Sequence, residues 1–202
     1  MRQAPFPHGI ITVLLVTGFE PFGGLARNPS GDLALALGDA HQNVQGAVLP
    51  VDYRRIEASL DALLQERWEA VVLLGVAVGR SVLSLEKVAI NYRDPQRPDN
   101  EGFAPADTDV VPGGPDAYFS TLPLARLRDA LTEEQVPHEL SLSAGPYLCN
   151  ASMYLARHKL GPDVPCGFIH VPPTPDLACG APPMEFELQK RGIGRVLGEL
   201  GA

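Results

Sequence analysis

The chain has 202 residues, of which 45% are hydrophobic, and its formal net charge is -8 at pH 7. This length suits one sizeable domain with a buried core, so we predict a single domain over residues 1–202. A negatively charged chain without a cluster of Lys and Arg has nothing to track a phosphate backbone, which excludes nucleic acid as the expected partner.

The first part of the chain predicts strands and helices behind a proline-rich tail. We expect the tail, residues 1–9, to be flexible and the apolar run 10–16 to form a buried strand. That run is too short to cross a bilayer, so no membrane partner is expected. The segment NPS at 28–30 is typical of a helix start and predicts a helix over 30–37, followed by a strand over 44–51.

The middle of the chain contains the most apolar segment and the least regular one. Helical spacing of apolar residues predicts a helix over 53–67, and the run AVVLLGVAV after it predicts a central strand covered on both faces. The alternating segment SVLSLEKVAIN predicts another strand. Residues 91–123 are rich in Pro, Gly and Asp, and a connection of that length is typically functional or mobile.

The last third of the chain continues the alternation. It predicts helices over 122–134, 147–159 and 184–200 and strands over 138–142 and 167–170. The whole pattern predicts a three-layer α/β/α fold around a mainly parallel, twisted central sheet. Functional sites in such sheets gather at the carboxyl ends of the strands.

Three cysteines, Cys149, Cys166 and Cys179, form no CxxC pair, and any one disulfide would leave an odd thiol. This usage favours a reducing cytoplasm over a disulfide framework. Cys149 follows Gly145-Pro146, a good helix opening, and so falls in the first helical turn. There the helix dipole favours the nucleophilic thiolate. The alternative for Cys149 is a small buried hydrophobe, which most free cysteines are.

A thiolate nucleophile needs a base, and His170 is the best of the five histidines for that role. It ends the predicted strand GFIH at a carboxyl edge, where a side chain can face the start of a neighbouring helix. His158 shares a predicted helix with Cys149 but lies about 13 Å further along its axis. Cys166 lies about 13 Å earlier on the strand of His170 and is expected in the core. A structural histidine is the alternative for His170.

Glu86 is the candidate for the polar group that orients such a base. Strand alternation places it on one face with Val82, Val88 and Ile90. A carboxylate among apolar neighbours is costly unless it is paired, and an imidazolium would satisfy it. An ordinary glutamate on an edge strand explains the position equally well.

Six segments together resemble the pyroglutamyl peptidase type I family, also called pyrrolidone-carboxylate peptidases. They are VTGFEPFGG with Asn28-Pro29, GRSVLSLEKVAIN, RPDNEG, PGGPDAYFSTLP, SAGPYLCN and GFIHVP, in the family's order and over nearly the whole chain. The resemblance implies a cytosolic, homotetrameric cysteine peptidase that removes N-terminal pyroglutamate from peptides without a metal or organic cofactor. It implies Cys149 as the nucleophile, His170 as the base and Glu86 as the orienting acid.

The resemblance also implies a pocket for the lactam ring. Its substrate-binding residues would be Phe19, Phe22, Asn28, Arg97, Tyr147 and Leu148. A neutral lactam suits flat apolar walls and a few directed hydrogen bonds. Val51 stands where the family often has Thr, which makes that wall more apolar.

The chain departs from the family's pattern beside this pocket. Members commonly read DARIPDNEG, with the Arg at the oxyanion site, whereas this chain reads DPQRPDNEG. Gln96 takes the Arg position and Arg97 replaces an apolar residue, so either the guanidinium has shifted by one residue or another group serves. This departure leaves a second reading open, a catalytically silent binder of pyroglutamyl or similar lactam peptides. A metal hydrolase using Cys149, Cys166, His170 and Cys179 is a weaker alternative, because the spacing matches no zinc motif.

Overall fold

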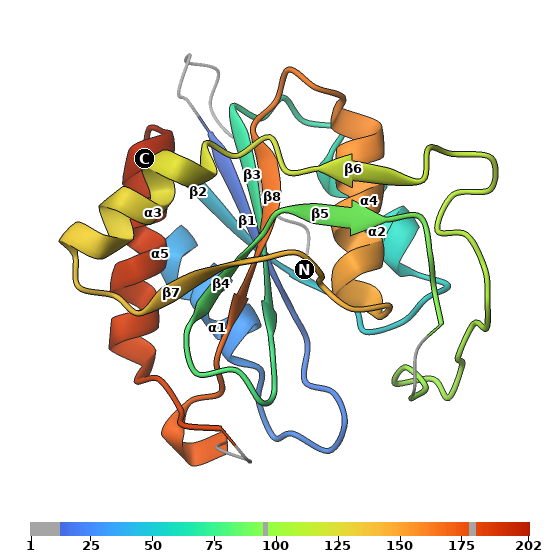
Figure 1. Ribbon diagram of the computed structural model, residues 1–202, viewed down its shortest axis with the longest axis horizontal. Helices are drawn as coiled ribbons and strands as arrows, with labels where there is room; N and C mark the ends of the chain where they lie inside the picture. Colours follow the sequence, from blue (N-terminus) through green and yellow to red (C-terminus); the bar gives the residue numbers. More distant parts are fainter. Residues whose placement is uncertain (1–12, 95–96, 178–180) are drawn as a thin grey trace.

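The computed structural model describes residues 13–94, 97–177 and 181–202 (Figure 1). The strands are β1 (Leu14–Phe19), β2 (Val44–Leu49), β3 (Ala70–Val76), β4 (Leu83–Glu86), β5 (Val88–Ile90), β6 (Ala117–Phe119), β7 (His138–Ser141) and β8 (Cys166–Val171). The helices are α1 (Pro29–Ala40), α2 (Ile56–Leu63), α3 (Leu124–Glu133), α4 (Leu148–Leu160) and α5 (Phe186–Leu200), with a short 3-10 turn at Pro175–Leu177. The tail predicted at 1–9 lies outside the described residues.

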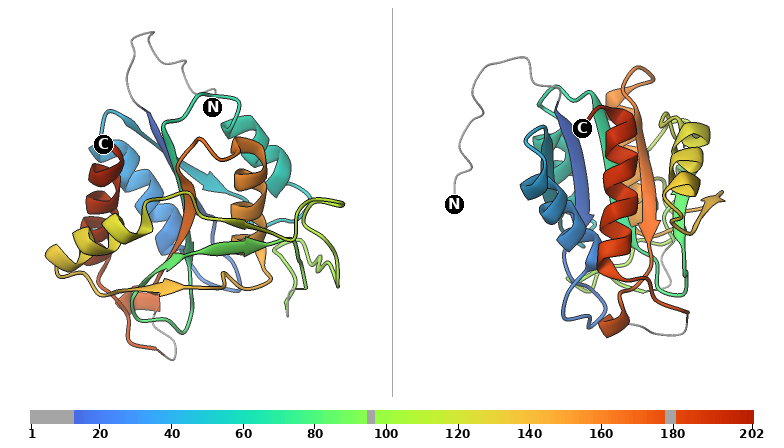
Figure 2. Two further views of the ribbon diagram at one scale, coloured as in Figure 1. Left: turned by 45° about the horizontal axis from the view of Figure 1, so that its top comes forward. Right: turned by 90° about the vertical axis from the view of Figure 1, so that its left-hand side faces the viewer.

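The central sheet has six strands in the order β2-β1-β3-β8-β4-β7. Every neighbouring pair is parallel except β4 and β8, which are antiparallel. Helices α1, α3 and α5 cover one face of this sheet, and α2 and α4 cover the other (Figure 2). The predicted single-domain, three-layer α/β/α fold with a mainly parallel sheet is therefore confirmed.

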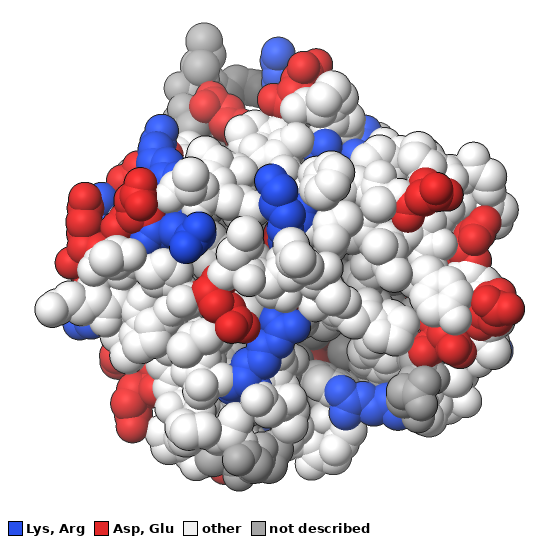
Figure 3. All heavy atoms as spheres, viewed as in Figure 1, with Lys and Arg blue, Asp and Glu red and all other residues white. Residues whose placement is uncertain are grey.

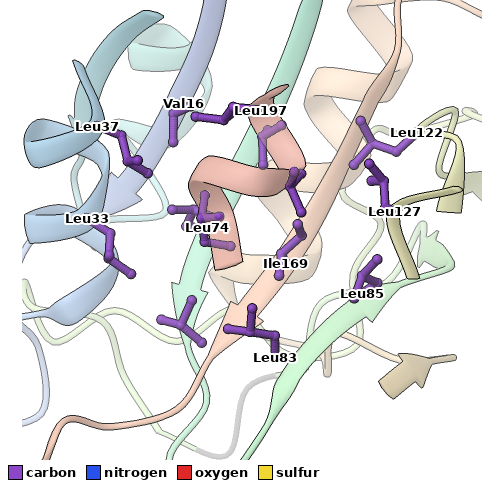
Figure 4. Packing of buried hydrophobic residues seen from close by; sticks show 14 of the residues in the cluster. Val16, Leu33, Leu37, Leu74, Leu83, Leu85, Leu122, Leu127, Ile169 and Leu197 are labelled. Carbon is purple, nitrogen blue, oxygen red and sulfur yellow. The ribbon is translucent and has the colours of Figure 1, made fainter. Parts of the chain in front are cut away.

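Each face of the sheet is sealed by its own apolar cluster. Figure 4 shows the cluster under α1, α3 and α5, where Leu33, Leu74 and Leu197 meet from a helix, a central strand and the closing helix. The second cluster includes Leu73, from the same strand as Leu74, and packs under α2 and α4. Because β3 is buried on both faces, its residues form a continuous apolar run.

Two differences from the sequence prediction follow from specific hydrogen bonds. The backbone N-H of Tyr53 donates to Asp99 Oδ2 at 2.9 Å, and that of Arg54 donates to Asp52 Oδ1 at 2.7 Å. These bonds hold a turn where the sequence predicted a helix, so α2 starts only at Ile56.

The strand predicted over 81–91 divides at Lys87. Its N-H donates to Ser141 O and its carbonyl accepts from Ser120 N, so β4 stays in the central sheet while β5 pairs with β6 in a separate one. Glu86 is fully buried and Ile90 is 41% exposed. The prediction that these two side chains share a face is therefore wrong.

None of the helices in the described part of the chain has the length and apolar composition needed to cross a bilayer.

Candidate active site

The first turn of α4 approaches the carboxyl ends of β3 and β8. Cys149 is the second residue of α4, as the sequence predicted, although Pro146 lies before the helix and not at its first position. Gly145 carries a φ of +75°, which a residue with a side chain rarely adopts, and so sets the direction in which the chain enters α4. His170 is the penultimate residue of β8 and is 4% exposed.

Gly75 shows that the sulfur of Cys149 and the imidazole of His170 are neighbours. Gly75 on β3 pairs with His170 on β8, and paired strands lie about 4.8 Å apart. A methyl group built on Gly75 would lie 3.0 Å from Cys149 Sγ and 2.7 Å from Phe168 Cζ. The Phe168 ring packs on the His170 ring with centroids 4.8 Å apart. All four side-chain positions therefore lie on the α4 face of the sheet.

Glu86 completes this group from the opposite side of β8. It ends β4, the antiparallel neighbour of β8, and its Oε1 lies 2.7 Å from His170 Nδ1. With Nδ1 donating to the carboxylate, Nε2 carries the lone pair and is free to accept a proton. Burial by itself would raise the pKa of Glu86, but hydrogen bonds from His170 and Ser141, together with the charge of Arg80, outweigh it and lower that pKa.

Arg80 is the residue of this group that sequence reasoning missed. Its Nη1 donates to Glu86 Oε1 at 2.7 Å, and its Nη2 donates to Ser143 O at 3.0 Å. Its position in a loop gives no periodic signal. The signal that was available was chemical, because a buried carboxylate calls for a cation and Arg80 is six residues away in the same segment.

The free protein holds Cys149 as a thiol. Burial, followed by the charge of Glu86, raises the pKa of Cys149 to about 12, while Arg97, the helix-start N-H of Cys149 and Arg80 lower it by less. Cys149 keeps partial exposure to solvent. Burial also lowers the pKa of His170 in spite of Glu86. Burial therefore favours a thiol and a neutral imidazole in the unliganded protein, whereas the helix start by itself predicts a thiolate.

A small apolar slot opens to solvent beside Cys149. Its lining residues are Phe19, Phe22, Asn28, Val51, Val76, Tyr147, Leu148 and Cys149. Of these, only Val76, at the carboxyl end of β3, was not expected from the sequence. Phe19 is the last residue of β1 and is almost fully buried. The turn in the segment TGFEPFGG therefore begins only after Phe19.

Asn28 supplies the amide in this slot. It caps α1, because its Oδ1 accepts from Ser30 N at 3.1 Å and from Ser30 Oγ at 2.8 Å. Its Nδ2 donates to Glu20 O at 3.0 Å. Among the described residues this is the one acceptor recorded for Nδ2, so its second N-H is available to a ligand.

Arg97 lies over the aromatic walls of the slot. Its Cζ is 4.9 Å from the centre of the Phe22 ring and 5.4 Å from that of Tyr147. The residue is exposed, so it stands at the mouth of the slot. Gln96, the other residue at the departure from the family pattern, lies outside the described residues.

The remaining cysteines are not part of this site. Cys166 is fully buried in the second apolar cluster, as expected. Cys179 lies outside the described residues. Within the described ranges, no group of three or more His, Cys, Asp and Glu side chains is arranged to hold a metal ion.

Comparisons with known proteins show the family of the chain. The chain matches the family described as pyroglutamyl peptidase over residues 12–194. It is 44% identical over 172 residues to the pyrrolidone-carboxylate peptidase of Pyrococcus furiosus, covering 81% of this chain and 82% of that protein. It is 40% identical over 191 residues to that of Thermococcus kodakarensis, covering 89% and 91%.

Solved structures give the same result at the level of the fold. The crystal structure of pyrrolidone carboxyl peptidase from Thermus thermophilus superposes with a TM-score of 0.87 at 41% identity, covering 92% of this chain and 98% of that one. A mutant pyrrolidone carboxyl peptidase from P. furiosus gives a TM-score of 0.86 at 38% identity, covering 93% and 97%. The chain therefore belongs to the pyroglutamyl peptidase family of cysteine peptidases.

Proposed function

We propose that the chain hydrolyses the amide bond after an N-terminal pyroglutamate, with Cys149 as the nucleophile, His170 as the base and Glu86 as the orienting acid. The observation that carries this proposal is the hydrogen bond from His170 Nδ1 to the buried Glu86 carboxylate, beside Cys149 at the edge of an apolar slot. A nucleophile, a base and a group that orients the base are the parts that acyl transfer needs.

The slot receives the lactam ring. Pyroglutamate has no ammonium group, so its ring is a compact neutral amide that packs between the Phe19 and Phe22 side chains, with Tyr147 and Leu148 closing the walls. The free N-H of Asn28 donates to the lactam carbonyl. A peptide with an ordinary charged N-terminus is rejected, because its ammonium would lose water without gaining a partner.

The reaction starts from the neutral pair. As Cys149 Sγ attacks the carbonyl carbon after the ring, its proton passes to His170 Nε2, and Glu86 stabilises the imidazolium that forms. The tetrahedral oxyanion is stabilised by the backbone N-H of Cys149, one of the unpaired donors at the start of α4. The imidazolium then protonates the leaving amine. Water, deprotonated by His170, cleaves the thioester and releases pyroglutamate.

Arg97 supplies a second donor at the oxyanion. This role is supported by its guanidinium, which lowers the pKa of Cys149 and lies over Phe22 and Tyr147. Arg97→Met should reduce kcat about tenfold or more, since an exposed donor is worth less than a buried one. Arg54→Met is the matched control, because Arg54 Cζ lies 4.7 Å over a different ring, Phe103. An unchanged kcat in Arg97→Met would remove Arg97 from the mechanism.

The decisive assay measures release of the chromophore from a pyroglutamyl p-nitroanilide by the purified, reduced protein. Cys149→Ala should abolish turnover, while Cys166→Ala, which removes a buried thiol outside the site, should retain it. Absence of turnover in the wild-type protein would refute the peptidase. Binding of pyroglutamate without turnover would favour the silent binder instead.

We also propose that the protein is a cytoplasmic homotetramer. A reducing compartment preserves the Cys149 thiol that the reaction requires. Apolar side chains are exposed on the small sheet and at the β7 edge, including Phe119 at 63% and Leu142 at 70%. Figure 3 shows stretches of uncharged surface between scattered charged side chains on the face carrying β5, β6 and β7. Light scattering that gives a monomer mass for the wild type would refute the tetramer.

A further inference from the structure

Arg80 contacts two parts of the site at once. Its side chain comes from the loop between β3 and β4 and is 30% exposed, whereas the Glu86 carboxylate that it contacts is fully buried. Its Nη1 donates to Glu86 Oε1, the same oxygen that His170 Nδ1 contacts, with both distances 2.7 Å. Its Nη2 donates to the carbonyl of Ser143, in the segment that leads into α4.

We propose that Arg80 is a positioning residue of the reaction: its planar fork joins the Glu86–His170 pair to the segment that carries Cys149, and its charge limits how readily His170 is protonated. The inference rests on the roles proposed above for Cys149, His170 and Glu86. The proposed mechanism gives no part to Arg80, and this inference adds one.

The charge of Arg80 opposes the imidazolium. The groups that act on His170 are burial, the Glu86 carboxylate and Arg80, and of the two charges Glu86 raises the pKa of His170 while Arg80 lowers it. The same charges act on the thiol of Cys149. Among the charged groups, Glu86 raises the pKa of Cys149, and Arg97 and Arg80 lower it. Arg80 therefore lets His170 remain a base at lower pH. Because Arg80 lowers the pKa of both Cys149 and His170, it does not widen the difference between them that burial sets.

The second contact fixes the approach to the nucleophile. From Ser143 to Tyr147 the chain is irregular, and its local bonds are long: Gly145 N donates to Ser143 Oγ at 3.2 Å and Ser143 N to Ser141 Oγ at 3.3 Å. A guanidinium that bonds Ser143 O and Glu86 together sets the distance between this segment and the acid. Lysine cannot replace it, because a single ammonium on a flexible stem does not reproduce the fork.

The test compares Arg80→Met, Arg80→Lys and wild type in two measurements. In the first, kcat/KM is followed against pH, with its acid limb reporting protonation of His170. In the second, the His170 ring is titrated by NMR in a Cys149→Ala background, which needs no turnover. Removing the cation favours the imidazolium, so Arg80→Met should move the acid limb and the NMR titration upward by about 0.5 to 1 pH unit. Arg80→Lys should leave both within about 0.3 unit.

The link that Arg80 makes between Glu86 and Ser143, called the tether below, is tested by rates at the pH optimum. Both variants lose the fork, so kcat should fall about tenfold in each, with KM within about twofold because Arg80 does not line the slot. Arg126→Met is the control, since it also removes an arginine paired with a glutamate, Glu199, but on the face of the sheet opposite α4.

The outcomes separate this inference from the proposed function. A wild-type protein without turnover would refute the proposed function, and the NMR titration would still test the charge of Arg80. Wild-type activity combined with an unshifted acid limb in Arg80→Met would overturn the electrostatic role. Wild-type kcat in both variants would overturn the tether. If Arg80→Met does not fold, an unchanged kcat in Arg80→Lys still overturns the tether, and an NMR titration shifted by 0.5 unit or more in Arg80→Lys overturns the electrostatic role.

Discussion

Gly75 should tolerate no side chain, because the site is packed against its Cα. A methyl group there would lie 2.7 Å from Phe168 Cζ, closer than real methyl groups approach heavy atoms, and 3.0 Å from Cys149 Sγ, which is a tight contact. The contact with Phe168 is relieved only if Phe168 or the β3 backbone moves. Phe168 is fully buried in the second apolar cluster and packs on His170. Gly75→Ala should therefore change the position of His170 relative to Cys149.

The expected size follows from two effects. Overpacking a buried site of this kind costs about 1 to 3 kcal/mol in the free energy of unfolding. A displacement of the nucleophile that approaches 1 Å costs about a hundredfold in rate. We therefore expect kcat/KM of Gly75→Ala to fall about ten- to a hundredfold, mostly in kcat, with a Tm lower by several degrees.

The assay is turnover of a pyroglutamyl p-nitroanilide at fixed pH, with thermal unfolding of the same samples. Gly198→Ala is the matched control, since a methyl group at this position of α5 would meet no atom within 4 Å among the described residues. It should be neutral or slightly stabilising, because alanine favours the helix. Wild-type kcat/KM in Gly75→Ala would refute the tight packing of Gly75 against Cys149 and Phe168.

Three further outcomes are expected. Glu86→Gln keeps the shape of the side chain but removes its charge, so kcat should fall about a thousandfold with little change in KM, measured in the same assay; a loss smaller than tenfold would contradict the role of Glu86. Asn28→Asp keeps the oxygen that caps α1 but loses the amide N-H groups, including the one that donates to Glu20 O, so KM should rise about tenfold and the Tm should also fall. Because the pKa of Cys149 is raised, its alkylation by iodoacetamide should be slow at pH 7 and accelerate about tenfold per pH unit between pH 7 and 9, followed by mass spectrometry; a rate independent of pH in that range would mean a thiolate at rest.

Local signals were enough to predict the residues that sit at the ends of regular elements. Cys149 follows a Gly-Pro break, and His170 follows a short apolar strand, so both could be assigned to a helix start and a carboxyl edge from their neighbours in the chain. The α/β alternation could be predicted for the same reason, because it depends on periodicity within each segment.

The parts that could not be predicted depend on contacts between distant segments. Alternation continues through Lys87, and only the hydrogen bonds of Lys87 to Ser120 and Ser141 divide the strand there. The role of Arg80 depends on Ser143, which is 63 residues away. A short window of sequence contains neither Lys87 with Ser120 and Ser141 nor Arg80 with Ser143, so pattern reasoning found the carboxylate at Glu86 but neither its face nor the link from Arg80 to Ser143.

The charge state of Cys149 depends on the relative size of two effects, of which the sequence pattern shows only one. The helix start stabilises a thiolate by an amount typical of a partly exposed helix end, about 1 kcal/mol. Taking a thiolate out of water beside a carboxylate costs more, so the pKa of Cys149 rises overall. The same fold brings the helix start and the apolar slot to Cys149. Apolar walls that suit an uncharged lactam also destabilise a thiolate.

The same balance explains why the base must be close and oriented. If the thiol keeps its proton at rest, sulfur attack and proton transfer to His170 have to occur together, and the imidazolium then needs Glu86 at the moment it forms. A bound lactam ring would exclude more water from Cys149 and oppose the free thiolate further. Substrate binding should therefore make the reaction depend more strongly on the Glu86–His170 pair, which predicts that Glu86→Gln is more damaging to kcat than to the alkylation of the free protein.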